Sequence, residues 1–223
     1  MNFNKHLDLK GKHAPLGASR YHWVNDDREQ LINRLCAQYA ADVGTIIHNY
    51  AASRIEYRLS LSKFEKKDLI LELLRNRIPR PIIDRLSINT VFENLTNYVN
   101  DCIGFRMTPE VTLFYSDICF GTCDAISYDE AKKQLRIFDL KTGITPARMD
   151  QLLIYSALFC MEYHVKPASL ESCELRIYQG AEPEIMEPTT DDIVAFCDQI
   201  VSGNKLCKDF LYNQLIFEED VAL

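Results

Sequence analysis

The sequence predicts a fold of the α/β or α+β class. Helical periodicity dominates the first hundred residues, while β-branched and aromatic residues dominate the segment from 109 to 143. Beyond that segment, one helical pattern, one strand pattern and further helical patterns follow in turn. Helices, a three-stranded meander, a helix, a strand and closing helices are together typical of an α/β or α+β domain.

Helical patterns follow a loose arm formed by residues 1–15. Residues 26–59 form one helix, or two helices that break at Gly44, and the acids in their first turn favour a helix N-terminus. Residues 62–77 are amphipathic at helical spacing, and the two prolines that follow them end this helix. Residues 90–103 form a third helix.

Strand patterns occupy the middle of the chain. Residues 109–116 and 118–128 are rich in β-branched and aromatic side chains, and a polar turn then leads to residues 135–143. This order predicts an antiparallel hairpin or meander. Residues 173–180 have the same character and predict one further strand.

Two helical regions complete the pattern. Pro146 stands at the first turn of a strongly apolar helix over residues 146–164, which we expect to be buried on more than one face. Residues 189–214 form one or two closing helices. Thr189 or Thr190 caps the first of them, because a threonine oxygen accepts hydrogen bonds from unpaired amides at a helix start.

The bulk composition is that of a globular protein. At 223 residues, with 47% apolar and 26% charged residues, the chain fits a single domain over residues 1–223. No apolar run approaches the roughly 18 residues of a membrane span. Residues 1–20 are polar and basic without a signal-peptide core, so we expect an intracellular, cytoplasmic protein. The eight cysteines include no C-x-x-C pair, which predicts reduced and mostly buried thiols.

Charge is distributed unevenly along the chain. The net charge of −7 argues against a generic binder of polyanions. Residues 53–85 nevertheless hold nine lysines and arginines against five acids, a net of +4, while residues 182–223 hold ten acids against two lysines, a net of −8. This asymmetry indicates one cationic face, although solvated helix faces explain the same counts.

The end of the third predicted strand carries Asp139 and Lys141, which share a face because side chains i and i+2 of a strand point the same way. Such a pair alone is typical of a surface salt bridge. Asp124, on the preceding strand, falls opposite Asp139 in a hairpin that turns near residues 129–134. Neighbouring carboxylates repel each other, and a divalent cation between them, Mg²⁺ or Mn²⁺, removes the conflict.

Three further residues lie in apolar segments where a polar side chain needs a partner. Gln151 and Tyr155 are four residues apart on one predicted helix, and therefore on one face. His48 lies in an apolar helical stretch, where it is either a core histidine or a third metal ligand. Gly121, three residues before Asp124, leaves room for the close approach of a backbone or a substrate.

Taken together, these motifs resemble a known family. "GTCD", "DLK" and "QLLIY" resemble the G-x-x-D, D-x-K and Q-x-x-x-Y motifs of the RecB-like branch of the PD-(D/E)XK nucleases, which includes phage lambda-type exonucleases. The helical "GTIIH" is similar to the histidine motif of that branch. The resemblance covers His48 to Tyr155, roughly half of the chain. It implies a restriction-endonuclease-like core at about 105–180, with a mixed central sheet flanked by helices, and a basic helical segment at about 53–104.

The resemblance also implies residue roles. The metal would be bound by a histidine, two carboxylates and one backbone carbonyl, namely His48, Asp124, Asp139 and the carbonyl of Leu140. Lys141 would serve the attacking water, and Gln151 and Tyr155 would order the site and contact nucleic acid. An iron–sulfur cluster is not expected, because the cysteines after Tyr155 lack the required spacing.

The expected activity is that of a Mg²⁺- or Mn²⁺-dependent deoxyribonuclease, more specifically an exonuclease in recombination, repair or phage DNA metabolism. The resemblance implies DNA as substrate, a recombinase, annealing protein or helicase as partner, and a homo-oligomer such as a ring, in a host cytoplasm if the protein is phage-encoded. Two alternatives stay open: a structure-specific or non-specific endonuclease, and a nuclease-fold module that only binds nucleic acid or protein.

Further residues are candidates for contacts with nucleic acid. "GASRY" resembles a phosphate-contacting segment of phage exonucleases, which makes Ser19 and Arg20 candidates. Glu110, at the start of the meander, resembles a glutamate of some family members. The basic segment contributes four candidates for phosphate contact: Lys66, Lys67, Arg75 and Arg77.

Overall fold

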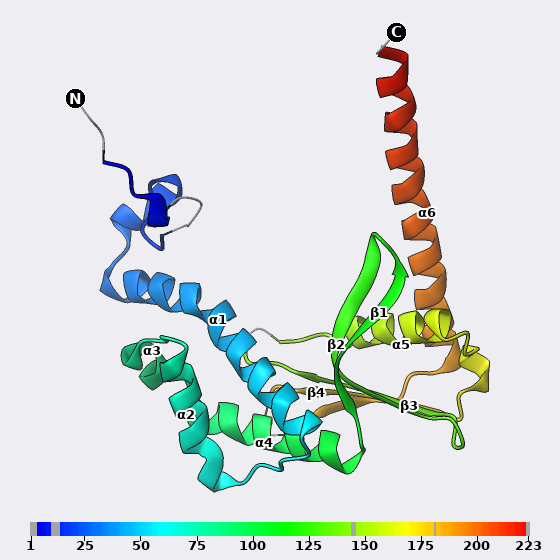
Figure 1. The fold of residues 1–223 in the computed structure, drawn as a ribbon, viewed down its shortest axis with the longest axis horizontal. Coiled ribbons are helices and arrows are strands. Elements are labelled where there is room, and N and C mark those ends of the chain that lie inside the picture. Colours follow the sequence, from blue (N-terminus) through cyan, green and yellow to red (C-terminus); the bar gives the residue numbers. More distant parts are fainter. Residues whose placement is uncertain (1–3, 10–13, 144–145, 181, 222–223) are drawn as a thin grey trace.

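The computed structural model of the chain describes residues 4–9, 14–143, 146–180 and 182–221, with side chains as far as residue 211. Its centre is a five-stranded sheet in the order β1-β2-β3-β4-β5, flanked by helices (Figure 1). Neighbouring strands are antiparallel except β3 and β4, which are parallel. The predicted α/β (α+β) class, with a mixed sheet and flanking helices, is confirmed.

Helix α1 runs unbroken from Arg28 to Glu56, after two short 3-10 helices, Leu7–Leu9 and Ala18–Asn25. Asp27 begins it with a capping box, in which its carboxylate accepts from the backbone of Gln30 and the Gln30 side chain accepts from the backbone of Asp27. Gly44 does not break the helix. A Cβ at Gly44 would lie 3.4 Å from the hydroxyl oxygen of Thr142, so the glycine lies where α1 passes close to the loop after β3.

The predicted second helix is a 3-10 turn followed by α2, and an additional short helix precedes the predicted third helix. A 3-10 turn, Lys63–Glu65, leads into α2 (Lys66–Arg75), and α3 (Arg80–Arg85) and α4 (Ile88–Gly104) follow. Pro81 does not merely end a helix, because it lies in the first turn of α3, where its missing N–H costs no hydrogen bond. Helix α3 was not predicted, because its six residues are too few for a clear period.

The predicted meander is present. β1 (Thr108–Ser116) and β2 (Cys119–Asp129) form a long ribbon that rises from the sheet, and β3 (Gln134–Leu140) pairs with the far end of β2 (Figure 1). β2 is long enough to take part in both the ribbon and the sheet. Its residues therefore connect the exposed ribbon with the sheet interior.

The C-terminal part differs from expectation at two points, the start of α5 and the presence of β5. α5 spans Asp150–Glu162, so the helix begins four residues after Pro146 and the predicted proline start is wrong. After a 3-10 turn at Pro167–Ser169, β4 (Ser172–Tyr178) is joined by β5 (Glu184–Met186), a three-residue edge strand that sequence patterning missed. A single helix, α6 (Thr190–Val221), closes the chain, and the Thr189 hydroxyl caps it by accepting from the backbone of Asp192 at 3.2 Å.

Two apolar clusters cover the two faces of the sheet. One joins α1, α2 and α4 to Phe138, Leu140 and Tyr178, and the other joins α5 to Leu135 and Ile137. Successive residues of β3 thus face opposite clusters, as the period of a strand requires. Because β3 is buried on both faces, any polar side chain on it needs a specific reason to be there.

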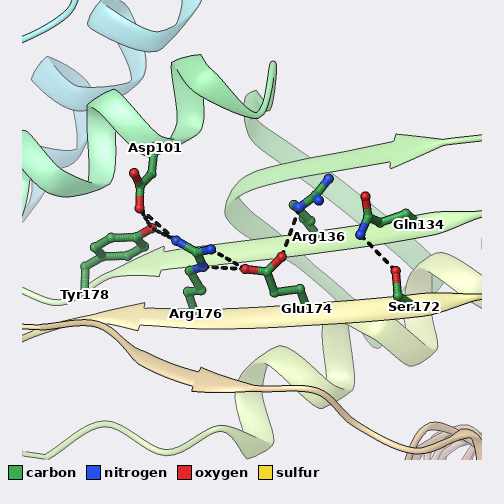
Figure 2. A network of polar contacts seen from close by, with 7 residues as sticks. All are labelled: Asp101, Gln134, Arg136, Ser172, Glu174, Arg176 and Tyr178. Atoms are coloured by element: carbon green, nitrogen blue, oxygen red, sulfur yellow. Dashed lines mark hydrogen bonds and ion pairs between the residues drawn. The ribbon is translucent and has the colours of Figure 1, made fainter. Parts of the chain in front are cut away.

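A polar network fixes the parallel pair β3–β4 against α4 (Figure 2). Arg136 donates to Glu174 at 3.1 Å, directly across the pair. Arg176 and the Tyr178 hydroxyl both donate to Asp101 of α4, at 2.8 and 2.7 Å. Charge-assisted bonds of this kind depend on geometry, so the network specifies how β4 is placed beside β3.

Two chemical expectations concern the whole chain. All eight cysteines are unpaired, and four of them are buried: Cys102, Cys123, Cys160 and Cys173. Cys207 is exposed, so the expectation of mostly buried thiols is only half met.

Within the described ranges, no helix combines the length and apolar character that a bilayer crossing needs.

Candidate metal centre and active site

The β2–β3 register places the two predicted aspartates across from each other. Ala125 pairs with Phe138, and Asp124 and Asp139 are the next residues along the two strands, at the end away from the connecting turn. The backbone N–H of Leu140 donates to Oδ2 of Asp124 at 2.8 Å, which locks that carboxylate against the end of β3. The two aspartates therefore lie at the same end of β2 and β3, as the predicted hairpin requires.

His48 reaches this end of the sheet from the middle of α1. Its Nδ1 lies 3.3 Å from Oδ1 of Asp124, and both side chains are largely shielded from solvent. Burial lowers the pKa of His48, but the hydrogen bond and the negative charge of Asp124 outweigh it and raise that pKa above 6.5. His48 is thus not an isolated core histidine, because its ring faces a carboxylate.

Glu110 completes a three-residue group with His48 and Asp124. One potential ligand atom of each residue lies within 4.8 Å of the others. Glu110 has a φ of 52°, a left-handed conformation that is unfavourable for a glutamate, although the β1–β2 register is the same on both sides of it. Burial, and then the charge of Asp124, raise the pKa of Glu110. A divalent cation among the three groups would relieve this electrostatic conflict.

Asp139 is the most deeply buried acid of the site, at 2% exposure. Its Oδ1 accepts a hydrogen bond from Nζ of Lys141 at 3.1 Å. Its Oδ2 also lies 3.0 Å from that ammonium, but without the direction of a hydrogen bond, and has no other partner among the described residues. Burial, and then the charge of Asp124, raise the pKa of Asp139 to about 6. Asp139 is not part of the three-residue group around His48.

A chain of hydrogen bonds leads from Lys141 into α5. Nζ of Lys141 donates to Oε1 of Gln151 at 2.9 Å, and Nε2 of Gln151 donates to the Tyr155 hydroxyl at 3.2 Å. The Tyr155 hydroxyl donates to the backbone carbonyl of Thr122 at 2.7 Å. The chain fixes the Lys141 ammonium beside Asp139. No sequence signal marked Thr122, because it contributes only a backbone atom.

Gly121 has a definite neighbour. A Cβ on this residue would lie 3.0 Å from Cε1 of Tyr155, closer than side-chain atoms normally approach. The group that approaches Gly121 closely is therefore the Tyr155 ring, and not the backbone or substrate that was expected. This contact seats α5 against β2 and holds the Tyr155 hydroxyl below the Thr122 carbonyl.

The donor set suits a hard divalent cation. One imidazole nitrogen and the carboxylates of Glu110 and Asp124 converge, and oxygen-rich sites of this kind fit Mg²⁺ or Mn²⁺. The Oδ2 of Asp139, which accepts no hydrogen bond from the described residues, adds a buried, electron-rich atom at the same end of the sheet. Of the predicted ligands, His48 and Asp124 belong to the group, and Glu110 joins them. Asp139 and the carbonyl of Leu140 lie on the neighbouring strand, β3.

The N-terminal candidates are not brought to this site. Ser19 and Arg20 are exposed in the 3-10 helix Ala18–Asn25. Arg20 lines a pocket of about 410 Å³ together with residues of the first part of α1, including Gln38. Ten helical residues separate Gln38 from His48, which corresponds to roughly 15 Å. A role for Ser19 and Arg20 would require a nucleic acid that follows α1.

The four basic candidates of α2 and its C-terminal turn differ in their surroundings. Lys66 donates to Oδ1 of Asn89 at 2.9 Å, and Arg75 lies 3.6 Å from Glu72. Lys67 and Arg77 are exposed, and neither has an ion-pair partner among the described residues. Half of the basic candidates are thus already engaged within the protein.

The chain matches no model of a protein family, and no curated protein sequence matches it either. The resemblance to RecB-like nucleases rests on its motifs, whose side chains His48, Asp124, Lys141, Gln151 and Tyr155 lie around one end of β2 and β3.

Proposed function

We propose that this protein is a Mg²⁺- or Mn²⁺-dependent deoxyribonuclease that hydrolyses phosphodiester bonds. The observation that carries the proposal is that two groups of side chains lie together at one end of β2 and β3. One is the convergent group of His48, Glu110 and Asp124, and the other is the buried Asp139 with its Lys141 ammonium. The first suits a divalent cation, and the second suits the handling of a proton beside it.

Each side chain has a distinct task in this proposal. His48, Glu110 and Asp124 hold the cation, with Asp139 beside them. When bound, such a cation lowers the pKa of water and neutralises charge on a phosphoryl group. Lys141 would orient the attacking water, since Gln151 holds its ammonium in place from α5. Tyr155 keeps Gln151 in place through its own bond to β2.

The mode of action that we favour is exonucleolytic, in recombination, repair or phage DNA metabolism, on the basis of the motif resemblance. An endonuclease on the same core is the second enzymatic candidate. A pure binding module is less consistent with the site, because a buried acid with a raised pKa, such as Asp139, is costly where no chemistry needs it. A recombinase, annealing protein or helicase as partner remains part of the proposal.

A digestion experiment tests the proposal. End-labelled linear duplex DNA and closed circular DNA are incubated with the protein and Mg²⁺ or Mn²⁺. We expect loss of linear DNA, survival of circles, and loss of activity in Asp124→Asn and Asp139→Asn variants. Asp198→Asn, an exposed change on α6, is the matched control and should retain activity. Cleavage that persists in excess EDTA or in Asp139→Asn would refute the assignment.

Metal binding gives an independent readout. As a ligand, His48 must be neutral, and Asp124 raises its pKa, so protons compete with the cation. Calorimetric titration with Mn²⁺ should show affinity falling by up to roughly tenfold for each pH unit below that pKa. His48→Ala should bind Mn²⁺ more weakly and with a smaller pH dependence. Equal affinities in the two proteins would remove His48 from the metal site.

A further inference from the structure

The exposed face of the β1–β2 ribbon carries three cross-strand pairs of side chains in one line. The register pairs Thr112 with Thr122 and Phe114 with Phe120. Glu110 and Asp124, at the next position of the same face, belong to the candidate metal group. Alternate residues of a strand point to the same side, so the line runs from the metal group toward the hairpin turn.

The outer two pairs are open to solvent. The hydroxyls of Thr112 and Thr122 lie 2.8 Å apart on the exposed face. Beyond them, Phe114 is 47% exposed and Phe120 is 60% exposed. Two phenylalanines paired across exposed strands are costly in water, and their side chains are largely uncovered by the described part of the chain.

The hairpin end that presents these rings is tied down. The backbone N–H of Phe114 donates to Oε2 of Glu162 on α5 at 2.7 Å. The Ser116 side chain contacts Asn204 of α6, and Figure 1 shows α6 rising beside the ribbon. Two helices therefore hold the ribbon, so the rings are displayed by an anchored element.

The lack of positive charge on the ribbon limits which part of a nucleic acid this face can bind. Residues 107–131, which include both ribbon strands, contain no lysine or arginine. The ribbon therefore offers no cation to a phosphate. It offers aromatic faces and hydroxyl groups, which suit the bases and sugars of an unpaired strand, because every base has a π-face that can stack.

We infer that the Phe114–Phe120 pair stacks on the bases of a single-stranded DNA segment whose phosphate backbone enters the metal group, and that Thr112 and Thr122 contact the sugars between them. The inference rests on the proposed nuclease function and assigns its substrate form. Phe120 and Asp124 are four positions apart on β2, roughly 13 Å along the ribbon. The stacked bases therefore lie within a few nucleotides of the bond to be cleaved.

Binding of a fluorescein-labelled oligothymidylate, followed by anisotropy in Ca²⁺, tests the inference. Ca²⁺ takes the same oxygen ligands as Mg²⁺ and is used here to slow turnover. The double variant Phe114→Ala/Phe120→Ala should bind roughly tenfold or more weakly. Its dependence of affinity on salt should be unchanged, since no phosphate contact is lost. A Phe114→Trp/Phe120→Trp variant should retain binding, and a double leucine variant should lose it.

The control is Phe210→Ala, because Phe210 lies on α6 with an exposure of 62%, close to that of Phe120. It should bind as the unchanged protein does. Equal affinity of the alanine variant would overturn the inference while leaving cleavage, and hence the proposed function, intact. Full binding by the leucine variant would exclude stacking. A change of oligomeric mass in the alanine variant with unchanged DNA affinity would assign the rings to a protein interface instead.

Discussion

At the scale of single residues, Asp139 shows how the site is prepared for a cation. Ile137 and Phe138 precede it on β3, and all three are buried. A carboxylate in such a place costs free energy unless it is paired, and Lys141 meets that cost only in part, since Oδ2 keeps no hydrogen bond. Without a cation, the ionised Asp139 carboxylate is therefore expected to lower the stability of the folded protein.

This cost predicts a pH-dependent gain in stability from Asp139→Asn. The folded-state pKa of Asp139 is raised from 3.8 to about 6, so folding binds a proton and the stability of the unchanged protein falls as pH rises through that window. The variant lacks this loss. In EDTA, its free energy of unfolding relative to the unchanged protein should rise by up to about 3 kcal/mol between about pH 4 and pH 7.

Urea unfolding of both proteins across this pH range measures the difference. Asp198→Asn, which removes an exposed carboxylate of α6, should show no such trend. A constant difference between Asp139→Asn and the unchanged protein would show that Asp139 stays ionised throughout. In that case the ion pair with Lys141 would fully offset its burial.

At the scale of secondary structure elements, the contact of α5 with β2 is decided by Gly121. The ring of Tyr155 fills the space that a Cβ would occupy. The Tyr155 hydroxyl then donates to the Thr122 carbonyl. Gln151, which lies one turn before Tyr155 on the same helix, donates to that hydroxyl. One glycine on a strand thus sets where α5 holds the Lys141 ammonium.

Gly121→Ala should therefore lower both stability and activity. The added methyl group forces the Tyr155 ring aside, and overpacking of this kind costs about 1–3 kcal/mol. Thermal unfolding and the cleavage rate measure the two effects. Gly203→Ala is the matched control: it lies within α6 with no atom within 4 Å of an added Cβ, so it should be neutral or stabilise by about 0.5–1 kcal/mol. Unchanged cleavage by Gly121→Ala would separate α5 from the chemistry.

At the scale of the whole molecule, charge decides where a nucleic acid can lie. Four arginines of the basic segment form ion pairs: Arg54, Arg75, Arg80 and Arg85. Lys67 and Arg77 keep free charges toward solvent. The positive surface available for phosphates is therefore smaller than the count of basic residues suggests.

A double variant, Lys67→Ala/Arg77→Ala, should weaken binding of duplex DNA and flatten its salt dependence. Each lost phosphate contact reduces the slope of log K against log salt by about 0.9. Filter binding over a series of salt concentrations measures the slope. Lys205→Ala/Lys208→Ala removes the same charge from α6 and should leave the slope unchanged. Equal slopes for both variants would show that this part of the basic segment is only a solvated helix face.

Much of the fold was predictable because its signals are local. The alternation in β1 and β2, the polar turn before β3 and the apolar run of α5 depend on neighbours a few residues apart. The short elements α3 and β5 were not predictable, since six and three residues carry no period. The start of α5 was misplaced because Pro146 is compatible with a helix start without requiring one.

The candidate site was predictable to the extent that β2 and β3 are adjacent in sequence. A turn of known length sets the register, so the sequence alone determined that Asp124 faces Asp139 and that Lys141 shares its side. Gln151 and Tyr155 were placed on one helix face for the same reason, because their spacing is a property of the helix itself.

Only the tertiary structure decided which groups surround these residues. His48 of α1 reaches Glu110 and Asp124 because α1 packs against β1, and Tyr155 meets Gly121 because α5 packs on β2. These contacts form between segments far apart in the chain. They depend on closing long loops and on burying both faces of the sheet, and no local pattern encodes either of these.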